Sequence, residues 1–126
     1  MSRATKARIS REAMLRSRPV RNSQVRWELD DNGEVVITLE LRKDWKTKLL
    51  SKLFYIPKRR RISLDEVGSR IWELCDGDHT VRDLIEFLRK KYKLNPKEAE
   101  VSLTNYLKQL GKKRLVAFAV PMREGS

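Results

Sequence analysis

The 126-residue sequence contains one cysteine, Cys75, and one histidine, His79. A lone cysteine excludes an internal disulfide and leaves too few thiolates for a structural zinc or iron–sulfur site. His79 has no second ligand beside it and falls in a predicted turn, so we interpret it as a capping or solvent-facing residue. Cys75 falls on the apolar face of a predicted helix and is interpreted as a small buried hydrophobic residue. We therefore expect no metal and no other cofactor.

Long apolar runs are also missing. Residues 1–21 are basic and interrupted by polar residues, and no run is long enough for a signal peptide or a membrane span. With the lone cysteine, this predicts a soluble protein of the reducing cytoplasm. A glycine-rich phosphate loop is absent as well, and the acidic residues Asp76 and Asp78 flank Gly77 in a predicted turn, where helix termination explains them. The chain is expected to be a binding module rather than an enzyme.

Basic residues are abundant, with 29 Lys and Arg against 17 Asp and Glu and a net charge of +12. Residues 1–26 contain eight basic residues and one acidic residue, and residues 42–61 contain nine and one. Residues 62–126 contain twelve and ten and are therefore nearly neutral. An excess of this kind favours acidic partners such as nucleic acid, an anionic membrane or an acidic peptide.

Residues 1–24 show no sustained periodicity and predict a flexible basic arm without a role in the fold, although residues 11–16 fit a short helical turn. Residues 25–41 alternate between apolar and polar side chains around an Asp-Asn-Gly sequence at residues 31–33. This pattern predicts a β-hairpin.

A basic region follows the hairpin. Residues 44–55 have the spacing of a short amphipathic helix, which Pro57 ends, and residues 58–64 predict a third strand with Ile62 and Leu64 on one face. The apolar stripe of the short helix fits core packing, a contact with a partner helix or an anionic membrane surface. The sequence leaves these three roles open.

Three predicted helices follow, each opened by a capping box, and a last strand is predicted within residues 115–120. The capping pairs are Ser63 with Glu66, Thr80 with Asp83, and Asn95 with Glu98. The predicted buried positions are Val67, Ile71, Leu74 and Cys75; Val81, Leu84, Ile85, Leu88 and Tyr92; and Ala99, Leu103, Tyr106, Leu107 and Leu110.

This order of elements predicts an α+β fold of the winged helix-turn-helix type, in which a three-stranded β wing precedes a three-helix bundle. The predicted organisation is an arm (residues 1–24), a domain (residues 25–120) with an amphipathic insert (residues 44–55), and a tail (residues 121–126). Such a fold does not by itself set the function.

Residues 64–77 (LDEVGSRIWELCDG), followed by Thr80-Val81 and by residues 107–110 (LKQL), resemble the PqqD family, small proteins named for pyrroloquinoline quinone synthesis. Residues 18–27 and the basic insert are similar to a stand-alone branch of that family. The resemblance covers about residues 18–116. Its most specific part is the combination of residues 71–74 (IWEL) with Asp76-Gly77 and Thr80-Val81.

The resemblance implies a peptide-recognition element without catalytic activity. Such domains bind the leader segment of a ribosomally made precursor peptide and present it to a modifying enzyme, often a radical SAM enzyme. In the family the leader adds as an extra strand to the third strand and lies in the groove between this strand and the third helix. The corresponding positions here are Arg59, Arg60, Arg61, Ile62, Ser63, Val101, Thr104, Asn105 and Lys108. Two departures are Ser102, where many members have an acidic residue, and Arg114, where many have glycine.

An edge strand suits this role because its unpaired N–H and C=O groups can bind an extended peptide. The arginines of residues 59–61 favour an acidic leader, although such a run is also typical of a solvated edge that resists aggregation. The alternative is a winged-helix nucleic-acid-binding protein that grips phosphates through residues 1–26 and 42–61. Reading of bases is disfavoured, since the third predicted helix balances Lys97 and Lys108 with Glu98 and Glu100.

Overall fold

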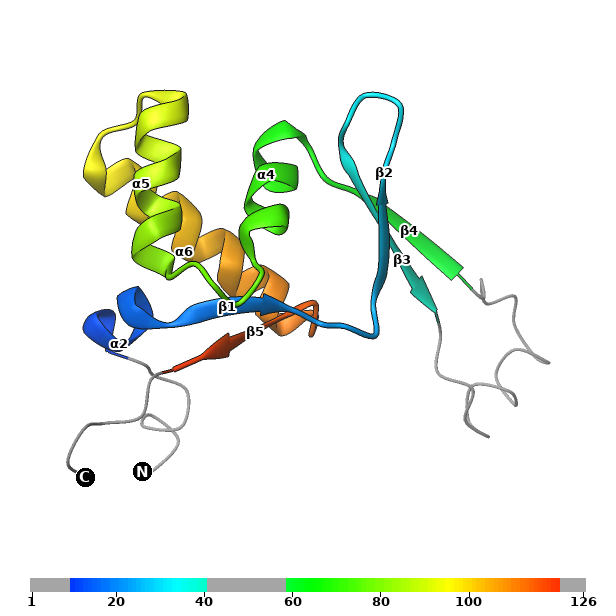
Figure 1. Cartoon of the computed structure of the whole chain (residues 1–126), viewed down its shortest axis with the longest axis horizontal. Helices are drawn as coiled ribbons and strands as arrows, with labels where there is room; N and C mark the ends of the chain where they lie inside the picture. Colours follow the sequence, from blue (N-terminus) through cyan, green and yellow to red (C-terminus); the bar gives the residue numbers. More distant parts are fainter. Residues whose placement is uncertain (1–9, 41–58, 121–126) are drawn as a thin grey trace. The chain divides into compact units, whose positions relative to one another are not determined.

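The computed structural model describes residues 10–40 and 59–120, and Figure 1 follows them along the chain. Within these ranges the fold is α+β, with antiparallel strands and four helices. The helices are α2 (Arg11–Arg16), α4 (Glu66–Leu74), α5 (Val81–Tyr92) and α6 (Pro96–Lys112), and the strands are β1 (Arg18–Arg21), β2 (Arg26–Leu29), β3 (Val35–Glu40), β4 (Arg59–Ser63) and β5 (Val116–Ala119).

The chain divides into two compact units, each described here by itself. The sheet unit comprises residues 23–70, and the helical unit comprises residues 1–22 and 71–126. The predicted insert at residues 44–55 and the predicted tail at residues 121–126 lie outside the described residues.

The sheet unit contains an antiparallel sheet with the strand order β2-β3-β4 (Figure 1). Both the predicted hairpin and the predicted third strand are confirmed. In the hairpin turn a carboxylate oxygen of Asp30 accepts from the amides of Asn32 and Glu34, each at 2.9 Å. Gly33 has a φ of 78°, a backbone conformation that glycine adopts without strain. Local turn chemistry therefore fixes the register of β2 against β3.

Strand β3 is the buried strand of this sheet, because Val35, Val36 and Ile37 are all buried. The partners of Val35 and Ile37 across the hairpin, Leu29 and Trp27, are 47% and 36% exposed. All four residues of β2 are exposed, so the alternation along β2 does not lead to burial.

In the helical unit, α5 and α6 pack against each other through apolar stripes. Their buried residues are Val81, Leu84, Ile85 and Leu88 on α5, and Ala99, Leu103, Leu107 and Leu110 on α6. Tyr92 and Tyr106, also predicted as buried, are half-buried. Both predicted capping boxes are confirmed, that of Thr80 with Asp83 and that of Asn95 with Glu98.

The prediction that residues 1–24 have no role in the fold was wrong for the described part of that segment. The short helical turn predicted at residues 11–16 is confirmed as α2, which is opened by Ser10, whose hydroxyl accepts from the Ala13 amide at 3.1 Å. Leu15, Ser17 and Pro19 are buried. Such short elements show no periodicity of their own, because packing against residues distant in sequence stabilises them.

Strand β1 lies between β5 and the turn that follows α4. On one side β1 pairs antiparallel with β5. On the other side the Arg21 amide donates to the Cys75 carbonyl at 2.9 Å, and the Gly77 amide donates to the Pro19 carbonyl at 3.0 Å. The last predicted strand is thereby confirmed, and its partner is β1.

Helix α4 begins differently from the prediction. Ser63, the predicted N-cap, belongs to β4, and a carboxylate oxygen of Asp65 accepts from the Gly68 amide at 2.7 Å. Ile71 and Cys75 are buried as predicted, and Trp72 is fully buried as well. Val67 is 36% exposed and Leu74 is half-buried, so the predicted apolar stripe is buried only in part.

Candidate functional site

Strand β4 is an edge strand, because within the described ranges it pairs with β3 alone. The amide of Leu64, directly after the strand, donates to the Val35 carbonyl at 2.8 Å. The direction of successive amides alternates in an antiparallel ladder. The Ile62 amide therefore faces β3, and the amides of Arg61 and Ser63 face the open edge.

Ser69 of α4 fixes the C-terminal end of β4 through two hydrogen bonds. The Ser69 hydroxyl accepts from the Val35 amide at 2.8 Å and donates to the Leu64 carbonyl at 3.3 Å. The hydroxyl thus stands between two backbone groups that bond directly to each other in a regular antiparallel ladder. Ser69 and Val35 are both fully buried, so this contact is shielded from water.

Five of the predicted peptide-binding residues form β4. Arg61 and Ser63 have exposed side chains, and Ile62 is half-buried. Arg59 and Arg60 belong to the strand by their backbone, and their side chains lie outside what the structure describes. The described part of this edge is therefore open to backbone hydrogen bonding and carries positive charge at Arg61.

The other four predicted residues lie on α6 in the helical unit. Val101 is 48% exposed, and Asn105 and Lys108 are also exposed. Thr104 is half-buried, and its hydroxyl donates to the Glu100 carbonyl at 2.8 Å. The structure thus brings the predicted residues together as two groups, one in each unit.

The structure adds an ion pair at this flank of α6 that the sequence did not indicate. Arg11 of α2 binds Glu100 with two hydrogen bonds, from Nε to Oε2 at 2.7 Å and from Nη2 to Oε1 at 2.9 Å. The hydrogen bond from Arg11 lowers the pKa of Glu100, and the same bond raises the pKa of Arg11. The two residues are 89 positions apart, and no local motif connects them.

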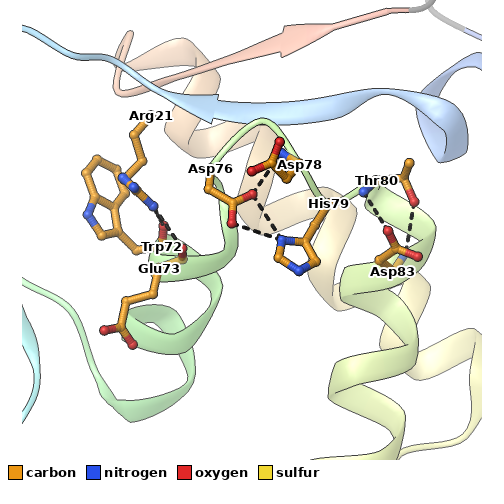
Figure 2. Close-up of polar contacts among 8 residues, drawn as sticks. All are labelled: Arg21, Trp72, Glu73, Asp76, Asp78, His79, Thr80 and Asp83. Carbon is orange, nitrogen blue, oxygen red and sulfur yellow. Dashed lines mark hydrogen bonds and ion pairs between the residues drawn. The ribbon is translucent and has the colours of Figure 1, made fainter.

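Arg21 of β1 stabilises the C-terminal end of α4 (Figure 2). Its Nη1 donates to the carbonyls of Trp72 and Glu73, at 2.9 Å and 2.8 Å. A guanidinium at this end of a helix satisfies carbonyls that lack intrahelical donors and interacts favourably with the helix dipole. We assign Arg21 a structural role.

The turn after α4 is also structural, and Figure 2 shows its side chains Asp76, Asp78 and His79. Burial raises the pKa of the Cys75 thiol to about 12, so the thiol is protonated at neutral pH. Desolvation raises the pKa of Asp76, but the hydrogen bonds from the Asp78 amide and from His79 outweigh it, and the pKa lies below its ordinary value. His79 Nδ1 lies 3.0 Å from the Asp76 carboxylate. These contacts agree with the predicted turn and with the interpretation of Cys75 as a buried hydrophobic residue.

Residues 10–40 and 59–120 contain no cluster of three or more His, Cys, Asp or Glu side chains that could hold a metal ion. In the same ranges no helix is long and apolar enough to cross a membrane.

An α+β fold with an open edge strand has the features of a protein that can bind an extended peptide. The sequence model of the family described as "Coenzyme PQQ synthesis protein D (PqqD)" matches residues 53–116. The chain therefore belongs to the PqqD family. The matched range ends in β5, as the resemblance predicted, but begins at residue 53 rather than near residue 18. Neither the curated proteins nor the solved structures that were compared gave a match.

Proposed function

We propose that this protein is a non-catalytic peptide-binding protein. It recognises the leader segment of a ribosomally made precursor peptide and presents it to a modifying enzyme, such as a radical SAM enzyme. Membership of the PqqD family supports a role as a peptide-binding partner. The observation that carries the proposal is the edge of β4, where the amides of Arg61 and Ser63 are directed away from β3.

In the proposed mode the leader adds to β4 as a further strand. Backbone hydrogen bonds supply affinity in such complexes, and side-chain contacts supply specificity. Arg61, and the neighbouring Arg59 and Arg60, favour a peptide that carries acidic residues. On this proposal the fold is of the winged-helix type, and the exposed residues of α6, from Val101 to Lys108, make further contacts with the peptide.

The net charge of +12 favours a second candidate, a nucleic-acid-binding protein. Two carboxylates on α6 weigh against the reading of bases by this helix. Glu98 caps the helix, and Glu100 is engaged by Arg11. A recognition helix normally presents donors to base edges. Contact with phosphates alone is therefore the form of this candidate that the structure favours.

The experiment that tests strand addition uses a displayed library of random short peptides and the full-length protein, with nuclease present throughout. Enriched peptides are then measured against Arg61→Pro and Arg61→Ala. Proline removes the outward amide, whereas alanine removes the charge and keeps the amide. Proline is tolerated at edge positions whose N–H faces outward. Arg61→Pro should weaken binding several-fold more than Arg61→Ala, on the order of one lost backbone hydrogen bond.

Ile62 is not suitable for this test, because its amide faces β3 and a proline there would disrupt the sheet itself. Equal effects of the two Arg61 variants would contradict strand addition. A library without any enriched peptide, together with retention of random-sequence duplex DNA, would favour the nucleic-acid candidate.

A further inference from the structure

A pocket lies between α2 and α6 within the helical unit. Its volume is about 290 Å³. Since one water molecule takes up about 30 Å³ of the liquid, the pocket has room for a side chain. The residues that line it are Arg11, Met14, Leu15, Glu100, Thr104 and Lys108. Thr104 and Lys108 are among the predicted peptide-binding residues, whereas the α2 residues are not.

Positive charge exceeds negative charge around this pocket. Glu100 is the only carboxylate among the lining residues. Arg11 binds it and lowers its pKa most strongly, and the charges of Arg82 and Lys97 lower the pKa further. Lys108 has no carboxylate partner within the described part of the chain. The described lining residues therefore comprise two cations, Arg11 and Lys108, and one carboxylate that Arg11 already binds, so Lys108 is left to attract a further anionic group.

The wall supplied by α2 is partly apolar. Met14 is half-buried and Leu15 is 3% exposed, and both line the pocket. A ligand that fits both features has a carboxylate at the end of a short aliphatic stem. The methylenes of such a ligand can lie against Met14 while the carboxylate reaches Lys108. Inorganic phosphate would use only the cationic part of the pocket.

We propose that this pocket binds a glutamate side chain of the recognised peptide, with Lys108 donating hydrogen bonds to its carboxylate. The proposal rests on the proposed peptide-binding function and adds to it a preference for one side chain. Helix α2 precedes the matched residues 53–116, so one wall of the pocket lies outside the family match. The pocket would thus combine a cation from within the family match, Lys108, with an α2 wall from a part of this chain that the match does not include.

The test uses peptides enriched from the random library, resynthesised with each glutamate in turn replaced by glutamine. Binding to the full-length protein is measured by fluorescence anisotropy. Replacement at one position should weaken binding about tenfold, the order expected when a hydrogen bond to a charged group is lost. Lys108→Met should abolish this difference between the two peptides. Lys112→Met, the same change one turn further along α6, should leave the tenfold difference intact.

The proposal would be overturned if no replacement of glutamate by glutamine weakened the binding of the enriched peptides. It would also be overturned if the Lys108→Met protein kept the tenfold difference between the two peptides. The proposed function would survive either result, provided that Arg61→Pro still weakens binding more than Arg61→Ala. A library that yields no binding peptide would overturn both.

Discussion

Ser69 connects α4 to the sheet through one hydroxyl group that serves as acceptor for Val35 and donor for Leu64. Serine is suited to this position because its hydroxyl both donates and accepts and is small enough to stand between two backbone groups. Loss of this group would leave the amide of a fully buried residue without its acceptor.

Ser69→Ala should therefore lower the free energy of unfolding by about 1–3 kcal/mol, the cost of an unsatisfied buried donor. The measurement is urea unfolding followed by circular dichroism. Ser63→Ala, the same change at an exposed position of β4, is the control and should cost less than about 0.5 kcal/mol. Equal midpoints for the two variants would show that the Val35 amide does not depend on this hydroxyl.

The start of α4 shows where sequence reasoning fails at the scale of single residues. Ser63 and Asp65 are both good N-caps, and the Ser-x-x-Glu pattern favoured Ser63. The structure uses Asp65, because Ser63 pairs with Val36 in the sheet. Strand pairing of Ser63 therefore determines which of the two residues caps the helix, and a local sequence pattern does not show this pairing.

At the scale of elements, the helices and strands that were predicted from the sequence are the ones whose signals lie within their own segments. Helices α5 and α6 carry their capping boxes and apolar stripes within their own segments, and the hairpin carries its turn. Helix α2 was indicated only as a short turn without a role in the fold, and strand β1 has no such signal. Strand β1 depends on β5 and on the turn after α4. Contacts between distant segments stabilise these elements, and a pass along the sequence does not detect them.

The attachment of α2 to α6 is expected to depend on pH. Because Arg11 lowers the pKa of Glu100 below its ordinary value of 4.5, the ion pair contributes stability above that value. The contribution is lost as the pH falls through the lowered pKa. Glu100→Gln should accordingly be less stable than the unchanged protein at pH 7, and thermal unfolding should show this difference disappear once the pH lies below the lowered pKa of Glu100.

Arg11→Gln removes the same ion pair from its other side and serves as the matched comparison. The double variant should be no less stable than the less stable single variant, since the two residues act as one pair. Additive losses at pH 7 would show that Arg11 and Glu100 stabilise the protein independently of each other.

At the scale of the whole molecule, the net charge is +12. Experiments must therefore distinguish the effect of the arginines of β4 on peptide binding from the effect of the net charge. Replacement of Arg59, Arg60 and Arg61 by glutamine should weaken the binding of an acidic library peptide at low salt. The loss should shrink as salt is raised, because the screening length falls from about 10 Å at 0.1 M to about 3 Å at 1 M.

A matched control replaces Lys112, Lys113 and Arg114 by glutamine, which removes the same number of charges from the end of α6. This variant should bind nearly as well as the unchanged protein. An equal loss in both variants would mean that the peptide responds to net charge alone, and unchanged affinity at low salt in the first would exclude an acidic leader.

The candidate site could be predicted only in part. The strand that forms the edge and its basic character follow from the sequence. The direction of each amide does not, because it depends on the register against β3. The α2 wall of the pocket was also missed, since the resemblance supplied residues only from the third strand and the third helix.

The position of β1 between β5 and the turn after α4 has a consequence for any shortened form of the protein. A chain cut to the family-matched residues 53–116 would lose the strand whose Arg21 covers the end of α4 and whose backbone bonds to Cys75 and Gly77. The cut would also remove all of β5 except Val116. We therefore expect the smallest piece that folds to extend beyond the limits of family similarity, because residues 10–22 contribute to the folding unit.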